Sequence, residues 1–232
     1  MANHLDLEEQ EQLDQLKHFW KQYGNLITWG LIVVLGAVAA WNGYQYWQRS
    51  QAVQAAAMYD EVERMARSGD LQKTERAFSE MKDRFSSTTY AQQAALMVAK
   101  VSYEKGDVDA AKAALSWAVD KASDKGYSAI ARLRLSGLLM DAKSYDEALK
   151  LLPANSGPEE FAALIADRRG DIYLVQGNKT EAKVEYQKAY QTFEPRSDYR
   201  RLVEVKLNAL GVNTETSGNG LAPSAVKTET TQ

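Results

Sequence analysis

Hydrophobic and polar positions divide the chain into one uncharged segment and a long region of helical periodicity. No charged side chain occurs between Gln22 and Gln48, and residues 26–47 read LITWGLIVVLGAVAAWNGYQYW. As a helix rising about 1.5 Å per residue, this stretch is about 33 Å long, which matches a bilayer hydrocarbon core of roughly 30 Å. The pattern therefore predicts a transmembrane helix over residues 24–47.

Aromatic residues at both ends of this segment support a membrane span, because tryptophan and tyrosine prefer the headgroup region. The two belts contain Trp20, Tyr23, Trp29, Trp41, Tyr44, Tyr46 and Trp47. A cleaved signal peptide is the alternative, since Ala37-Val38-Ala39 has the small-x-small form of a cleavage site. The acidic residues before the segment, and the apolar run that continues after the cleavage position, favour an anchor that is kept.

Residues 1–23 form the tail before the span. Leu13, Leu16, Trp20 and Tyr23 recur at helical spacing among charged residues. This pattern predicts a short amphipathic helix at the membrane surface, which leads into the span. A protein-binding peptide is the alternative for the same residues.

Small residues inside the span suggest a helix-packing face. Gly36 with Ala40, and Ala39 with Gly43, form overlapping small-xxx-small pairs. Such pairs let two membrane helices approach closely, so they predict packing against a membrane partner. The alternative is that glycine and alanine are simply common in membrane helices.

The charges that flank the span do not decide its orientation. Lys17 and Lys21 precede it, while Arg49, Arg64 and Arg67 follow it within about 20 residues, the distance over which such charges count. Acidic residues contribute little to this rule. Either end of the chain could therefore face the cytoplasm on this criterion.

The remainder of the chain is predicted to be all-α and repetitive. Alanine-rich runs favour helices, proline is confined to the presumed connections, and no stretch alternates like a strand. The segments GDVDAAKAAL, KSYDEALKLL and GNKTEAKVEY share a turn, a polar helix start, a small residue and an apolar residue four positions later. The small residues are Ala111, Ala148 and Ala182, and a weaker copy places Thr74 first. Repeats of this length predict stacked helix pairs that cross at the small residue.

These units resemble the tetratricopeptide repeat. In the last unit Gly170, Tyr173, Ala182, Tyr186 and Ala189 fall where that family has small, aromatic, small, aromatic and small residues, with a proline shortly after. The earlier units keep part of the pattern. The resemblance implies a helical-repeat solenoid over residues 48–211, with an irregular helical solenoid as the alternative.

The same resemblance implies a binding groove, because the first helix of each pair lines the concave face of such a stack. The positions that correspond to the family's groove are Leu96, Lys100, Tyr103, Leu133, Gly137, Met140, Asp167, Asp171 and Leu174. An apolar floor with polar groups suits an extended or helical peptide. Ordinary packing between repeats is the alternative role for several of these residues.

The end of the chain has two parts. The segment RSDYRRLVEVKLNALG, residues 196–211, predicts a C-terminal capping helix, amphipathic through Leu202, Val205 and Leu210. Residues 212–232 are polar and poor in apolar groups, so this tail is predicted to be disordered.

Composition argues against catalysis and nucleic-acid binding. The chain has no cysteine, and its two histidines, His4 and His18, lie in the N-terminal tail. The formal net charge is -3, without the basic surface that nucleic acid requires. No phosphate-binding loop, nucleophile elbow or metal-ligand spacing occurs. We therefore expect no catalytic residue, no cofactor, no metal site and no nucleic-acid partner.

The whole arrangement resembles one bacterial family. An acidic tail leads to LKHFWKQYG, a single span ends in GYQYW with QRSQ after it, and a helical-repeat domain follows that contains IADRRGDIYLVQGNKTEA. This order is similar to the YfgM-type ancillary subunits of the SecYEG translocon, and the similarity covers about residues 8–211.

The resemblance implies a single-pass protein of the bacterial inner membrane, with a cytoplasmic N-terminus and a periplasmic repeat domain. Implied partners are the SecYEG translocon, a membrane-anchored periplasmic chaperone of the PpiD type, unfolded secreted chains and the lipid bilayer. Its implied role is to help pass secreted chains to periplasmic chaperones. An envelope-assembly scaffold of the same topology and a cytoplasm-facing membrane adaptor are the alternatives.

Overall fold

The computed structural model describes residues 7–154 and 157–212, with side chains from Leu13 onward. Within these residues the structure is helical and contains no strand, which confirms the predicted all-α class. The helices are α1 (Leu7–Ser68), α2 (Leu71–Phe85), α3 (Thr89–Glu104), α4 (Val108–Lys121), α5 (Lys125–Asp141), α6 (Tyr145–Leu151), the 3-10 turn η1 (Glu159–Phe161), α7 (Ala162–Val175), α8 (Lys179–Thr192) and α9 (Asp198–Ala209). Apart from Val212, the tail predicted to be disordered lies outside the described residues.

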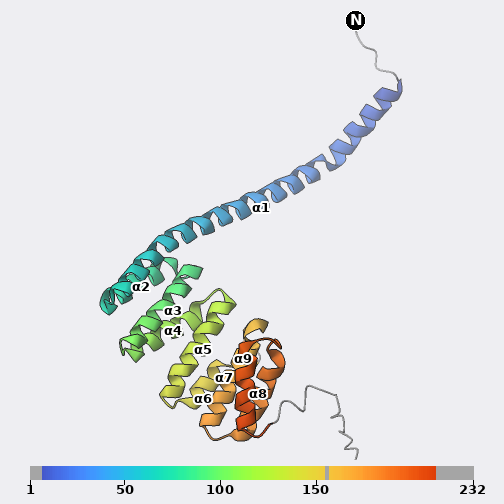
Figure 1. The fold of residues 1–232 in the computed structure, drawn as a ribbon. Helices are drawn as coiled ribbons and strands as arrows, with labels where there is room; N and C mark the ends of the chain where they lie inside the picture. The colour runs from blue at the N-terminus through green and yellow to red at the C-terminus, as the bar shows by residue number, and fades with distance from the viewer. Residues whose placement is uncertain (1–6, 155–156, 213–232) are drawn as a thin grey trace, which may run out of the picture. The chain divides into compact units, whose positions relative to one another are not determined.

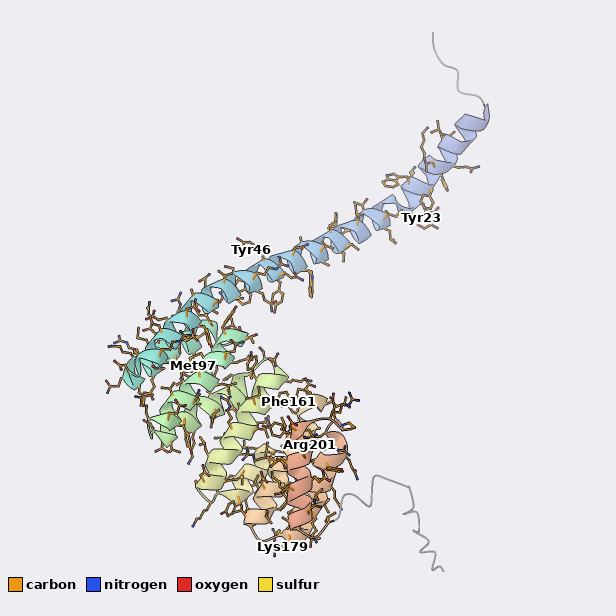
Figure 2. All side chains as sticks on the ribbon, viewed as in Figure 1. Tyr23, Tyr46, Met97, Phe161, Lys179 and Arg201 are labelled. Carbon is orange, nitrogen blue, oxygen red and sulfur yellow. The ribbon has the colours of Figure 1, made fainter. Side chains whose placement is uncertain are left out.

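The chain forms two units, residues 1–54 and residues 55–232. The described part of the first unit is the N-terminal portion of α1, which includes the predicted span. Its apolar side chains project from all sides of the helix between Tyr23 and Tyr46 and are exposed (Figure 2). Among the described residues, α1 is the one helix long and apolar enough to cross a membrane, as predicted.

Two polar side chains within the predicted span bond to the backbone of the helix itself. The hydroxyl of Thr28 donates a hydrogen bond to the Gly24 carbonyl at 2.7 Å, and the amide of Asn42 donates to the Val38 carbonyl at 2.9 Å. Such local bonds are needed in lipid, because an unsatisfied polar group there costs several kcal/mol. An exposed apolar surface, with these two side chains bonded inside the helix, is suited to a bilayer.

The second unit is a stack of helix pairs (Figure 1). The end of α1 shares a core cluster with α2, while α3 pairs with α4, α5 with α6 and α7 with α8, and α9 follows the last pair. The predicted small residues occupy the fourth position of the second helix in each pair and are all fully buried. They are Thr74, Ala111, Ala148 and Ala182. The repeat and its register were therefore predicted correctly.

The turns between paired helices repeat as well. Gly106, Lys143 and Gly177 each have a positive φ, and the residue after each donates a backbone hydrogen bond of 2.8 Å to a carbonyl five positions earlier. This is the Schellman closure of a helix, which needs one residue in the left-handed region. Lys143, with φ of 59°, is the one described non-glycine residue in that conformation.

The cap packs through a different face from the predicted one. In α9 the fully buried side chains are Val203 and Leu207, whereas Leu202 is 49% and Val205 64% exposed. The assignment of Leu202 and Val205 to the buried face is therefore wrong, while Leu210 does pack against this core. The error has a physical reason: α9 carries apolar residues at helical spacing on two faces, and periodicity alone cannot choose between them.

Candidate functional site

The first helices of successive pairs carry the predicted groove positions, and one pocket beside them lies between α3 and α5. A pocket of about 280 Å³ opens there. Its lining residues come from α3, α4 and α5 and are Ala99, Lys100, Tyr103, Leu115, Arg134, Gly137, Leu138 and Asp141. Three of the nine predicted groove residues, Lys100, Tyr103 and Gly137, therefore meet at one cavity.

The pocket has an apolar floor and a charged rim. Ala99, Leu115 and Leu138 are buried beneath it, and the half-exposed ring of Tyr103 forms one wall. On the rim, the Lys100 ammonium lies 3.7 Å from the Glu104 carboxylate in an exposed i,i+4 pair, which contributes only a few tenths of a kcal/mol. Lys100 therefore remains available to a ligand.

Gly137 leaves this pocket open without a packing reason. It lies inside α5, where glycine costs about 1 kcal/mol relative to alanine. A Cβ built on it would meet only the Nη1 atom of Arg168 at 3.7 Å, an ordinary contact distance. Gly170 in α7 is different, because a Cβ there would lie 2.5 Å from the ring of Tyr186. Packing against Tyr186 requires glycine at position 170, whereas no neighbour requires the glycine at position 137, which lines the pocket.

Two arginines flank Gly137 and were not predicted from the sequence. Arg134 lies one turn earlier on α5, and its Nη1 donates to the Leu96 carbonyl at 3.2 Å. Arg168 comes from α7, and its Nη1 lies 3.9 Å from the sulfur of Met140. Within the described residues, neither guanidinium forms a salt bridge with a carboxylate. Their role depends on the packing of α5 against α7, which the sequence pattern does not reveal.

The remaining predicted apolar residues contribute mainly to packing. Leu96 is buried in the first core cluster, and Leu133 and Met140 are partly buried against the cluster between α5 and α7. Leu174, near the end of α7, is just over one-third exposed. Among the described residues, Leu174 is the predicted apolar groove residue outside the pocket whose side chain is exposed.

Asp167 and Asp171 are bound to the capping helix. Both carboxylates lie 2.7 Å from the Nζ atom of Lys206 in α9, and the hydroxyl of Tyr186 donates to Asp171 at 2.7 Å. Burial raises the pKa of the Asp167 carboxyl, and the nearby Asp171 adds to this, while the Lys206 hydrogen bond opposes it. Burial also raises the pKa of the Tyr186 hydroxyl, which therefore stays protonated as a donor. In this structure the two carboxylates hold the cap in place.

A second buried ion pair joins the two helices of the last pair. The Nε atom of Arg169 donates to Glu185 at 2.6 Å, and its Nη1 donates to the Leu152 carbonyl at 2.8 Å. Both side chains of the pair are largely buried. Separating the two partners would leave each charge buried and unpaired, which is strongly unfavourable. The pair therefore holds α7 and α8 in this arrangement. No signal in the sequence distinguishes these two residues from solvent-exposed charges.

The predicted packing residues of the span are exposed within the chain. Gly36, Ala39, Ala40 and Gly43 are all exposed, and a Cβ at Gly36 or Gly43 would meet no atom within 4 Å. A partner helix could therefore approach this face. In the described part of the chain, no group of three or more potential metal ligands gathers.

Comparison with known proteins gives consistent matches over most of the chain. The model of a family described as "Tetratricopeptide repeat-like domain" matches residues 17–212. A relative from Neisseria gonorrhoeae is 31% identical over 216 residues, covering 90% of this chain and 100% of the relative. One from Haemophilus influenzae is 33% identical over 208 residues, covering 88% and 98%, and one from Escherichia coli is 26% identical over 207 residues, covering 88% and 97%. All three relatives are named "Ancillary SecYEG translocon subunit".

Proposed function

This chain belongs to the tetratricopeptide repeat-like family and is related over nearly its full length to proteins named ancillary SecYEG translocon subunit, and on that premise we propose that it is a membrane-anchored binding subunit of the Sec translocon. The observation that carries the proposal is the joining of an exposed, apolar membrane helix to a helical-repeat domain in one chain. The helix anchors the protein, and the repeats bind polypeptide.

Anchoring explains how weak contacts can suffice. A binding surface tied to the membrane beside the translocon acts at an effective concentration on the order of millimolar, so each contact can be weak. We propose that the groove engages secreted chains or a membrane-anchored periplasmic chaperone of the PpiD type, and that this helps pass secreted chains to periplasmic chaperones. Residues 1–23 are then cytoplasmic, residues 24–47 cross the inner membrane and residues 48–211 lie in the periplasm.

Copurification with SecY tests the association. The full-length chain, extracted in mild detergent, is expected to retain SecY. Gly36→Leu with Gly43→Leu fills the proposed packing face and is expected to reduce the retained SecY several-fold. Gly30→Leu is the matched control, because Gly30 lies in the same helix and is equally open. Absence of SecY from the wild-type sample refutes the proposal, and equal loss with the Gly30 variant refutes the assigned face.

Orientation can be measured cleanly because the chain has no cysteine. Lys17→Cys and Lys179→Cys are introduced separately, each at an exposed position in its own unit. A membrane-impermeant maleimide added to intact spheroplasts should label residue 179 and leave residue 17 unlabelled until the membrane is opened. The reverse pattern would establish a cytoplasm-facing adaptor.

Crosslinking from the groove residues tests the other alternative. Crosslinks to envelope-assembly proteins, with none to the translocon or to a chaperone, would favour a scaffold.

A further inference from the structure

We propose that the pocket over Gly137 receives one large apolar side chain of a partner polypeptide, and that acidic residues on one side of it bind Arg134 and Arg168. This inference rests on the proposed function, since it specifies what the repeat groove binds. It predicts a partner segment of defined chemistry, an apolar residue next to carboxylates.

The size and lining of the pocket support a single apolar side chain. A cavity of about 280 Å³ is at the lower limit for small-molecule sites, which are usually about 300–1,000 Å³. Its floor is formed by Ala99, Leu115 and Leu138, and the Tyr103 ring can stack against an aromatic group. A side chain inserted here would cover apolar surface that now faces solvent. Specificity for a large apolar residue follows.

The space above Gly137 is what admits that side chain. Gly137 lines the cavity, and a Cβ built on it would meet a single atom within 4 Å, the Nη1 of Arg168, so a larger residue at this position of α5 would take up space at the pocket. The helix would be more stable with alanine. A glycine that weakens its own helix, and that no neighbour requires, is explained by an occupant of the pocket.

The charge around Gly137 supports acidic neighbours on one side. Arg134 lies one turn before Gly137, Arg168 approaches it from α7, and no described carboxylate forms a salt bridge with either. A guanidinium has five N–H donors, so the bonds that each makes within the chain leave donors free for a carboxylate. Asp141 lines the opposite end of the pocket and would repel an acid there. The complementary segment is therefore acidic only toward the arginines.

Fluorescence anisotropy with the full-length chain in detergent micelles tests this chemistry. The probes are two labelled peptides, Gly-Ser-Asp-Glu-Phe-Gly-Ser-Gly and Gly-Ser-Gly-Phe-Asp-Glu-Ser-Gly, which place the acidic residues before and after the phenylalanine and so cover both directions of a bound chain. The peptide that binds more tightly is compared with two altered forms. In one the phenylalanine is replaced by alanine, and in the other, the Asn-Gln form, Asp-Glu is replaced by Asn-Gln. Each change should weaken binding about tenfold, which corresponds to about 1.4 kcal/mol.

Variants of the protein assign the binding to this pocket. Gly137→Leu should weaken binding about tenfold or more, and Gly137→Ala should weaken it less, because only a methyl group enters the cavity. Arg134→Gln should reduce the preference for the acidic peptide over the Asn-Gln form, and Arg134→Gln with Arg168→Gln should abolish it. Arg76→Gln, an exposed arginine on α2 outside the pocket, is the matched control and should bind as the wild type does.

Three binding results would overturn the inference: equal binding of all peptides, no binding up to millimolar concentration, or unchanged binding to Gly137→Leu. Self-association of the chain that Arg134→Gln abolishes would also overturn it, because the occupant of the pocket would then be a second copy of the chain. The same samples are assayed for SecY. Retained SecY without peptide preference refutes the pocket chemistry alone, whereas peptide preference without SecY refutes the translocon proposal alone.

Discussion

Replacing Gly170 with alanine tests the closest helix contact in the repeat domain. A Cβ at this position would lie 2.5 Å from the Cδ1 and Cε1 atoms of Tyr186 and 3.1 Å from its Cγ. Non-bonded carbon atoms prefer about 3.5–4.0 Å, so one of the two helices or the ring must move. The ring is fully buried, and its hydroxyl donates to Asp171 at 2.7 Å. Tyr186 therefore has little freedom to yield.

The magnitude follows from three contributions. Overpacking of a filled core costs about 1–3 kcal/mol. Displacement of the ring also weakens a hydrogen bond to a carboxylate, which contributes about 1.5–3 kcal/mol. Alanine regains about 1 kcal/mol of helix propensity relative to glycine. We expect Gly170→Ala to lower the free energy of unfolding by about 2–4 kcal/mol.

Thermal denaturation of the full-length chain, followed by circular dichroism in detergent, measures this effect. For a protein of this size, the expected loss lowers the Tm by roughly 5–15 °C. Gly137→Ala is the matched control, because it makes the same chemical change inside another helix where a Cβ has room. It should raise the Tm slightly. A Tm shift of the same sign and size in both variants would refute the reasoning.

Three further outcomes follow from the packing and the charges. Lys143→Gly should stabilise the domain by about 0.5–1 kcal/mol, because it removes a left-handed strain of about 1–2 kcal/mol at the expense of chain entropy, whereas Lys143→Ala should change little in the same urea titration. Ala182→Leu should destabilise by about 1–3 kcal/mol in that titration, since the position is fully buried where helices cross, and an unchanged midpoint would contradict this. Lys206→Ala should cost about 2–3 kcal/mol at pH 7, because it leaves the Asp167 and Asp171 carboxylates together without their cation. The pKa of Asp167 is already raised in the folded protein, and it rises further without Lys206. As the pH falls from 7 toward about 4, the folded variant therefore binds a proton that the unfolded chain does not, and the stability lost in Lys206→Ala should shrink. A loss of stability that grows over this pH range would refute the reasoning.

The repeat architecture was predictable because its sequence signal is local and recurrent. Crossing helices need a small residue, and the closure of the preceding helix fixes where that residue falls, so Ala111 and Ala182 mark the same point in successive pairs. The membrane helix was predictable for a similar reason, since lipid requires a continuous apolar stretch. Each feature depends on neighbours in sequence.

The charged contacts were not predictable, because they join residues that only the stacked helices bring together. Asp167 meets Lys206 from 39 positions away, and Arg168 reaches Gly137 across two helices. In the sequence these residues have the same appearance as any solvent-exposed charge. The sequence predicted part of the pocket. The family resemblance pointed to Lys100, Tyr103 and Gly137, whereas Arg134, which completes the rim, was identified only from the structure.

The division of the apolar interior has a consequence for how the domain opens. One cluster joins residues of α1 to α5, another joins α5 to α7, and a third joins α7 to α9. Because each cluster involves consecutive helices only, local unfolding can stop at the boundary between clusters. Amide hydrogen exchange should therefore report the last helix pair and its cap as one cooperative unit, and the first two pairs as another. Heat or mechanical pulling on the C-terminus would then release the domain in steps.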